Sequence, residues 1–223
     1  AAAGSRIGLI EEGLDGLEAS VASAFTTFCA AAEEGFGPMA RRRFPALAAC
    51  YAMGDVISKV EAATLHGAWM AERPDRYSQA VFSRTEPGLH VPAPRYLEAL
   101  ALRARVLEGF LAETFANLDV LLCPAVPIPT PTRAEADMEQ GERVFPVVAA
   151  ITRLTRPFSY LGLPVLTVPA GLDGNGMPIG VQLIGRPFGE ARLLSVGARL
   201  AALTGWRGPP AALRGQARPG HLA

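Results

Sequence analysis

Residues 159–190, SYLGLPVLTVPAGLDGNGMPIGVQLIGRPFGE, decide the fold of this chain. Within them, Pro164–Ala170 and Ile179–Gly185 are apolar runs of strand length, rich in Val, Leu and Ile. The segment GLDGNG between the runs is rich in residues that form tight turns, so it predicts a hairpin. A helical pattern over Glu190–Leu203 follows. The stretch therefore predicts two antiparallel strands and then a helix.

Upstream of this stretch, short apolar strands alternate with longer helical patterns. Strands are expected at Arg6–Ile10 and at Asp119–Cys123, where Pro124 halts the second. Asp55 is a plausible N-cap for one of the helices. Apolar residues at steps of three and four predict helices over Leu17–Glu34, Asp55–Glu72 and Pro94–Asn117. This alternation, followed by a hairpin, predicts an α/β fold in which helices cover both faces of a mixed β-sheet.

Other segments lack a regular pattern. Arg41–Met53 is irregular and could hold a further strand. Arg73–Pro94 and Ala125–Arg143 are rich in proline and predict irregular connections. Prolines also interrupt Val144–Tyr160, so short helical turns are expected there. Residues 209–223 are expected to form a poorly ordered tail.

Composition narrows the classes of function. Acidic and basic residues number 21 each, and the arginines are scattered apart from Arg41–Arg43, which does not favour a nucleic-acid surface. No apolar run reaches the roughly 18–20 residues of a membrane span, and the first residues lack a signal-peptide pattern. Cys29, Cys50 and Cys123 are irregularly spaced. They indicate reduced thiols in a cytoplasmic protein, not a disulfide framework or a zinc site.

Four pieces of sequence, taken in order, resemble one known family. They are RIGLIEEGLDGLEASVASAF, VEAATLHGAWMAERPDRY, the spacing Arg84…Gly88…Tyr96…Arg103, and DVLLCPAVPIPTP ahead of the hairpin. Together they resemble the C-terminal half of the amidase signature family, hydrolases of carboxamides that include one of the subunits of tRNA-dependent amidotransferases. The resemblance covers roughly residues 5–204. It implies that residues 1–208 are the C-terminal portion of a single amidase domain.

The resemblance implies a reaction, hydrolysis of a carboxamide C–N bond to an acid and ammonia or an amine. Family members resemble one another in using a serine nucleophile, a second serine and a lysine, with both serines in a Gly-Ser-Ser-Gly loop. Here no two serines are adjacent, and the only lysine, Lys59, lies in a predicted helix. Ser58 beside it is no relay, because neighbours on a helix point apart. We therefore expect a missing N-terminal segment to carry the catalytic residues, and this chain to be inactive without that segment. We expect no cofactor and no metal.

The resemblance also marks candidates for the wall of a substrate pocket. They are Cys123, Pro124, Ala125, Thr152, Thr155, Ser159 and Arg84. The first three end a predicted strand, where such sheets place binding groups, although a buried thiol before a rigid turn is an equal alternative. Thr152 stands where glutamine-using relatives have an aspartate, and Ser159 where they have an asparagine. Arg84 keeps the arginine of an R-x-x-x-G pattern and could meet a carboxylate. This set favours a plain amidase over a glutamine amidotransferase.

Alternatives from other classes stay open. The chain could be a non-catalytic binding or partner subunit that keeps half of the fold. Without the resemblance, it reads as an α/β domain that binds a small molecule. If the chain is part of an amidase, its expected partners are a small-molecule amide substrate and the missing amidase segment. A homo-oligomer is also possible under this hypothesis. An uncovered sheet edge and uncovered apolar faces predict poor solubility or obligate association, whereas a monodisperse monomer would favour the partner subunit.

Overall fold

A computed structural model describes residues 4–137 and 144–205 of the chain. Their strands form one sheet in the order β2-β1-β3-β5-β4. The strands are β1 (Ile7–Ile10), β2 (Ala40–Arg42), β3 (Val120–Pro124), β4 (Val165–Leu172) and β5 (Pro178–Gly185). β1 runs parallel to β2 and β3, whereas β5 runs antiparallel to β3 and β4. The sheet is therefore mixed, as the sequence predicts.

The predicted hairpin is confirmed as β4 and β5. Val165 pairs with Ile184, and the register continues to Leu172 opposite Pro178 with an irregularity at Pro169/Gly171. In the turn, the Asp173 carboxylate accepts hydrogen bonds from the backbone N–H groups of Asn175 and Met177, both at 2.9 Å. An aspartate that ties its own turn together in this way favours a tight reversal of the chain.

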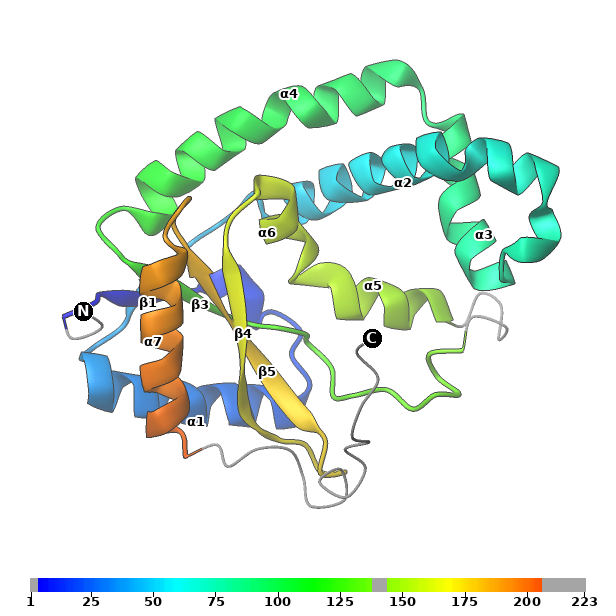
Figure 1. The fold of residues 1–223 in the computed structure, drawn as a ribbon. Coiled ribbons are helices and arrows are strands. Elements are labelled where there is room, and N and C mark those ends of the chain that lie inside the picture. The colour runs from blue at the N-terminus through cyan, green and yellow to red at the C-terminus, as the bar shows by residue number, and fades with distance from the viewer. Residues whose placement is uncertain (1–3, 138–143, 206–223) are drawn as a thin grey trace, which may run out of the picture.

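Helices cover both faces of the sheet (Figure 1). On one face, α1 (Ala19–Phe36) and α7 (Glu190–Leu203) pack through side chains such as Phe28 and Val196 against Val120 and Leu122 of β3. On the other, α2 (Leu47–Glu72) and α6 (Arg156–Leu161) share a core with Leu121. The alternation along β3 thus divides the apolar side chains into two cores. α4 (Ala93–Gly109) arches over α2 and continues into a π-helical turn, η4 (Phe110–Phe115).

The start of α2 corrects the expected helix. The helix begins at Leu47, so Asp55 lies inside it and is not an N-cap, and most of the segment that could hold a strand is helical. β2 is the short strand that this region does contain. Alanine and leucine after Phe44 favour a helix, and Asp55 has ion-pair partners within the fold that satisfy its carboxylate. An aspartate in a helical pattern is therefore an ambiguous marker of a helix start.

The proline-rich segments differ from one another. The expected irregular connection over 73–94 contains α3 (Gln79–Thr85), capped by the Ser78 hydroxyl, between the 3-10 turns η2 (Pro74–Arg76) and η3 (Glu86–His90). The short helical turns expected before the hairpin are α5 (Phe145–Arg153) and α6. Residues 125–137 hold neither helix nor strand, and the predicted tail, 209–223, lies outside the described residues. Among the described helices, none has the length and apolar character needed to cross a membrane.

Candidate functional site

The carboxyl ends of β1 and β3 lie at the same edge of the sheet, because the two strands are parallel. The chain leaves β1 through the 3-10 turn η1 (Glu11–Leu14). Beyond this edge, the first turns of α2 approach α5, and the Arg153 guanidinium of α5 donates to the backbone oxygen of Asp15 at 2.5 Å. This is the edge at which open α/β sheets bind ligands.

An ionic cluster lies beside this edge, centred on Asp55. One Asp55 oxygen is 2.7 Å from Lys59 Nζ and the other is 3.0 Å from Arg156 Nη1. The Arg156 guanidinium also stacks over the Tyr51 ring, 4.4 Å from the ring centroid. One carboxylate therefore holds two cations, and the arginine is fixed further by its contact with the aromatic ring.

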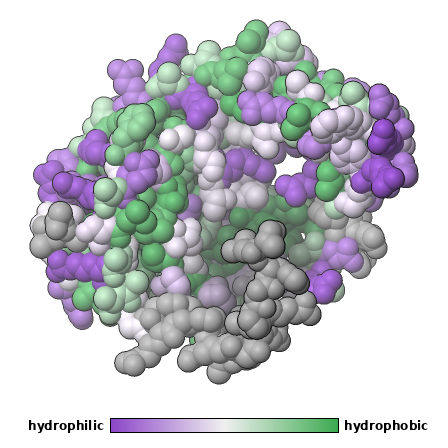
Figure 2. Space-filling view, in the orientation of Figure 1, coloured by the Kyte–Doolittle hydropathy of each residue, from purple (hydrophilic) through white to green (hydrophobic). Residues whose placement is uncertain are grey.

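Arg84 of α3 lines a cavity that also contains the residues of this cluster. The cavity there is about 420 Å³ in volume, and its walls come from α2, α3, α5 and α6, with Asp55, Lys59, Arg84 and Arg156 among them. Figure 2 shows this face hollowed between α3 and α5. Arg84 makes no ion pair with any residue that the structure describes. Three cationic side chains thus face one carboxylate, which makes the cavity suited to an anionic group.

The three candidate hydroxyls lie along α5 and α6, but they do not converge. Thr152 Oγ1 donates to the Val148 carbonyl at 2.8 Å and lies 3.4 Å from the Tyr51 hydroxyl. Thr155 and Ser159 each donate to a backbone oxygen of the preceding turn, at 3.4 Å. Ser159 faces a separate hollow of about 550 Å³ between α2 and α4. Only Thr152 therefore contacts a residue of the Arg84 cavity through its hydroxyl.

Cys123, Pro124 and Ala125 are all buried. Burial raises the pKa of the Cys123 thiol to about 12, against a smaller opposing effect of Arg153. The Ala125 N–H donates to the Gly180 carbonyl at 2.9 Å, so the strand pairing extends one residue past β3. In this chain the three residues have the character of a buried thiol and a rigid turn, and their pocket role stays a prediction.

Comparison with known proteins identifies the family of this chain. The family model described as Amidase matches residues 2–194. The chain belongs to the amidase family. It is 36% identical over 113 residues to a fatty acid amide hydrolase of Medicago truncatula, and 35% identical over 144 residues to a component of the glutamyl-tRNA(Gln) amidotransferase of Gluconobacter oxydans (strain 621H). These matches cover 51% and 62% of this chain, and only 18% and 28% of the two relatives.

Solved structures agree with this membership. A structure titled "Crystal structure of amidase" superposes with a TM-score of 0.77 at 26% identity, covering 90% of this amidase chain and 46% of its own. A structure from a vestigial protein complex, described in connection with the origins of an s-triazine catabolic enzyme, gives 0.76 at 28% identity and covers 92% and 44%. The amidase chain thus spans less than half the length of these structures.

Gln182 is a functional residue candidate that sequence reasoning missed. Its side chain is buried, and Nε2 donates to the carbonyls of Pro124 at 3.1 Å and Leu154 at 3.0 Å. It therefore fastens the end of β3 to the junction of α5 and α6, which carries the candidate hydroxyls. A lone polar residue in the apolar run VQLIG is the signal that could have identified it.

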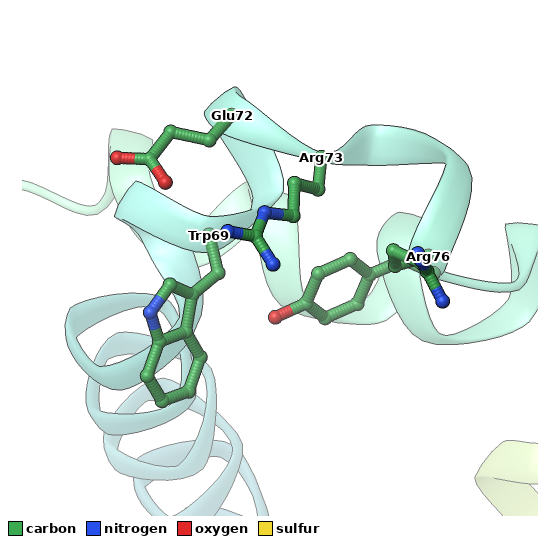
Figure 3. Close-up of a pocket in the computed structure, with 5 residues that line it drawn as sticks. Trp69, Glu72, Arg73 and Arg76 are labelled. Carbon is green, nitrogen blue, oxygen red and sulfur yellow. The ribbon is translucent and has the colours of Figure 1, made fainter.

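A further cavity, of about 510 Å³, lies at the far end of α2 (Figure 3). Trp69, Arg73 and Tyr77 line it, and the Arg73 side chain extends into the space beside Trp69. His66 Nδ1 lies 3.0 Å from the Tyr77 hydroxyl, so the His66 ring has a hydrogen-bond partner. Glu72 and Arg76 point away from one another (Figure 3).

Proposed function

We propose that this amidase chain forms one wall of the substrate site of an enzyme that hydrolyses carboxamide C–N bonds to an acid and ammonia or an amine. A nucleophile-bearing amidase segment outside these 223 residues supplies the reacting serine. The observation that carries the proposal is the family match over 2–194 in a chain that has no adjacent serines. In this proposal residues 1–208 form one structural unit, and the buried free thiols support a reducing, cytoplasmic location.

The position of Lys59 supports the proposal that another segment carries the catalytic groups. A lysine that takes a proton from serine acts in its neutral form, next to the hydroxyl that relays the proton. Here the ammonium of Lys59 is held by Asp55 at 2.7 Å, within the ionic cluster. The group that activates the nucleophile is therefore expected on the same segment as the nucleophile.

The site favours a plain amidase over a glutamine amidotransferase. Thr152 stands where an aspartate would hold the substrate amine, and its hydroxyl hydrogen-bonds within its own helix. Asp55 is engaged by Lys59 and Arg156. Arg84 makes no ion pair with any described residue, and its guanidinium matches a carboxylate or carbonyl oxygen of a substrate.

The test is turnover by the purified 223-residue chain. Release of ammonia from simple carboxamides such as acetamide and benzamide is measured for the chain alone and for the chain produced with the in-frame sequence encoded ahead of Ala1. The proposal expects no release above the buffer rate for the chain alone and release by the pair. Turnover by the chain alone, lost in a Ser58→Ala variant, would contradict it.

A partner subunit without catalytic function is the second candidate. Exposed apolar surface counts against a partner subunit that stands alone: Leu97 and Leu100 of α4 are 62% and 37% exposed, and β4 forms an edge of the sheet. Such surfaces in other proteins are covered by a partner, which here is the nucleophile-bearing segment or a second copy. A monodisperse monomer that melts cooperatively and gains no activity with the upstream segment would favour this candidate.

A further inference from the structure

The turn between β5 and α7 holds a large aromatic side chain in a backbone conformation that favours glycine. The turn runs from Arg186 to Gly189 and is closed by a hydrogen bond from the Gly189 N–H to the Arg186 carbonyl at 2.9 Å. Phe188, its third residue, has a φ of 59°. Turns with a positive φ at this position favour glycine or asparagine there, because a Cβ atom crowds the backbone. Phenylalanine at this point therefore destabilises the turn.

Packing within the chain does not explain the choice of phenylalanine. Phe188 is 97% exposed, more than any other large apolar residue that the structure describes. A single exposed apolar residue is common on protein surfaces, but here the exposure is combined with backbone strain, which gathers at functional positions. A residue that is unfavourable in the free chain on both counts is explained by what it contacts in a complex.

The turn is held firmly in place by Arg186. Its Nε donates to the Leu118 carbonyl at 3.2 Å, a second guanidinium nitrogen donates to the Ala116 carbonyl, and the group stacks 4.9 Å from the centroid of the Phe115 ring. Among the described residues, only Ala116 and Phe188 combine a side chain with a positive φ, 41° and 59°. Contacts of one arginine thus join the two strained positions. A side chain fixed in this way loses little freedom when it binds a partner.

The Phe188 turn lies at the end of the sheet opposite the candidate site. β5 runs antiparallel to β3, and its last residue, Gly185, pairs with Val120, the first residue of β3. The candidate site lies instead beside the carboxyl ends of β1 and β3. The Phe188 ring is therefore placed to contact a partner and is remote from the substrate.

We propose that Phe188 is the anchor through which this chain docks onto the nucleophile-bearing segment, in an apolar pocket of that segment with carboxylates at its rim. The inference rests on the proposed function for the existence of the segment. The family match runs over residues 2–194 and so includes the turn. Of the two solved structures described above, the chain covers only 46% and 44%. More than half of each lies outside the part that resembles this chain, and a segment of that size needs a large surface to pack on.

The charges around the turn define the rim of the pocket. Arg192, in the first turn of α7, and Arg6 share the carboxylate of Asp119, at 2.5 Å and 3.9 Å. The two arginine side chains are 53% and 59% exposed. Arg186 adds a third guanidinium, and Glu190 adds a second carboxylate at the start of α7. Three cations thus stand against two anions, and carboxylates on the partner would complement this surface.

Removing the ring tests the inference through the association of the two polypeptides. The 223-residue chain is titrated by calorimetry with the nucleophile-bearing segment, as the parent and as Phe188→Gly. Loss of a fully buried phenylalanine ring should weaken the association about 10- to 100-fold. Phe188→Tyr keeps the ring and should stay within about threefold of the parent. Leu65→Ala removes another apolar side chain, 64% exposed on α2, and should leave the affinity unchanged.

The same substitution should stabilise the free chain. Glycine and asparagine adopt a positive φ with less strain than phenylalanine. Thermal unfolding of Phe188→Gly and Phe188→Asn should therefore give a Tm about 2–4 °C above that of the parent. A phenylalanine with a merely structural role would lower the Tm when it is removed. Opposite changes in stability and in affinity thus distinguish an anchor from a structural residue.

Covering of the turn is measured directly with Phe188→Cys. In the chain alone, the introduced thiol should react with iodoacetamide as an exposed thiol does. With the segment in excess it should react at least about tenfold more slowly, because the reactivity of a thiol follows its exposure. Leu65→Cys is the matched control, and its thiol should react equally fast in both samples.

Three results would each overturn the inference: association of Phe188→Gly as tight as that of the parent, no association of the parent, or an introduced thiol that stays reactive in the complex. Self-association of the chain alone that Phe188→Gly abolishes would assign the anchor to a second copy and overturn it too. A complex that forms through Phe188 but hydrolyses no amide contradicts the proposed function and leaves the anchor standing. Hydrolysis by a pair that assembles equally well without the Phe188 ring does the reverse.

Discussion

Gly88 lies directly against the backbone of Lys59. A Cβ atom built at Gly88 would be 2.0 Å from the Lys59 carbonyl oxygen and 2.8 Å from the Ala63 Cβ. Only glycine allows this approach of η3 to α2. The contact carries α3 to the side of α2 that holds Asp55 and Lys59, and so places Arg84 in their cavity. The spacing R-x-x-x-G therefore has a physical reason, since the glycine positions the arginine.

Replacing Gly88 by alanine should force η3 away from α2. We expect the free energy of unfolding to fall by about 1–3 kcal/mol, the usual cost of overpacking. Urea unfolding measures this loss of stability. Gly109→Ala is the control, because its Cβ would meet nothing within 4 Å and alanine favours a helix, so a slight gain in stability is expected. A Gly88→Ala variant as stable as the parent would contradict the packing described here.

Removing the Asp55 carboxylate should leave Arg156 without its ionic partner. The Arg156 side chain is only 18% exposed, so we expect Asp55→Ala to lower the free energy of unfolding by about 1–3 kcal/mol. Glu98→Ala breaks the exposed pair with Arg95 and should change it by no more than about 0.5 kcal/mol. Chemical denaturation compares the two, and equal losses would show that the Asp55 cluster is an ordinary surface pair.

Replacing Gln182 by leucine should leave the carbonyls of Pro124 and Leu154 without their donor in a buried environment. We expect a loss of about 2–4 kcal/mol in stability, because each unsatisfied buried group costs about 1–3 kcal/mol. Gln79→Leu, at an exposed position, is the control and should stay within about 0.5 kcal/mol of the parent. Thermal unfolding of the two variants gives the answer, and matching melting temperatures would speak against a fastening role for Gln182.

The buried thiols should be unreactive in the native chain. Burial raises the pKa values of Cys50 and Cys123 to about 12 from 9.0, so both stay protonated at pH 8 and alkylation by iodoacetamide is expected to be far slower than in urea. Because the folded pKa lies above the unfolded one, stability is fully present below about pH 9 and is lost as the pH rises toward 12. Mass spectrometry of the alkylated peptides follows the reaction. Labelling of Cys123 in the native chain at the rate of a free thiol would refute its burial.

The parts of the fold that the sequence predicts best are those determined locally. The hairpin and α7 follow from two apolar runs, a turn and one helical pattern that are close together in the chain, and the structure has α7 over the predicted residues, Glu190–Leu203. α3 was missed because its few residues lie among prolines and gain order by packing on α2. The beginning of α2 was missed because an internal aspartate looks like a cap until Lys59 and Arg156 are seen beside it.

The candidate site was harder to predict, because its contacts join distant segments. Arg84 was found through a sequence resemblance, but nothing local indicates that Tyr51 of α2 would stack on Arg156 or contact Thr152 of α5. The candidates at the end of β3 followed a sound rule about strand ends, yet the residues there are buried by the pairing of β3 with β5. Gln182 fastens that strand end, and the only local sign of its role is that it is a lone polar residue in the apolar run VQLIG.

The location of the nucleophile tests the central claim most directly. A fluorophosphonate reagent, which attaches covalently to activated serines, is added to the purified chain alone and to the chain together with the proposed nucleophile-bearing segment. Intact-mass spectrometry identifies the labelled polypeptide. Our account predicts no label on the chain alone, and label on the added segment of the pair. A serine of this 223-residue chain that becomes labelled in the absence of the segment would contradict it.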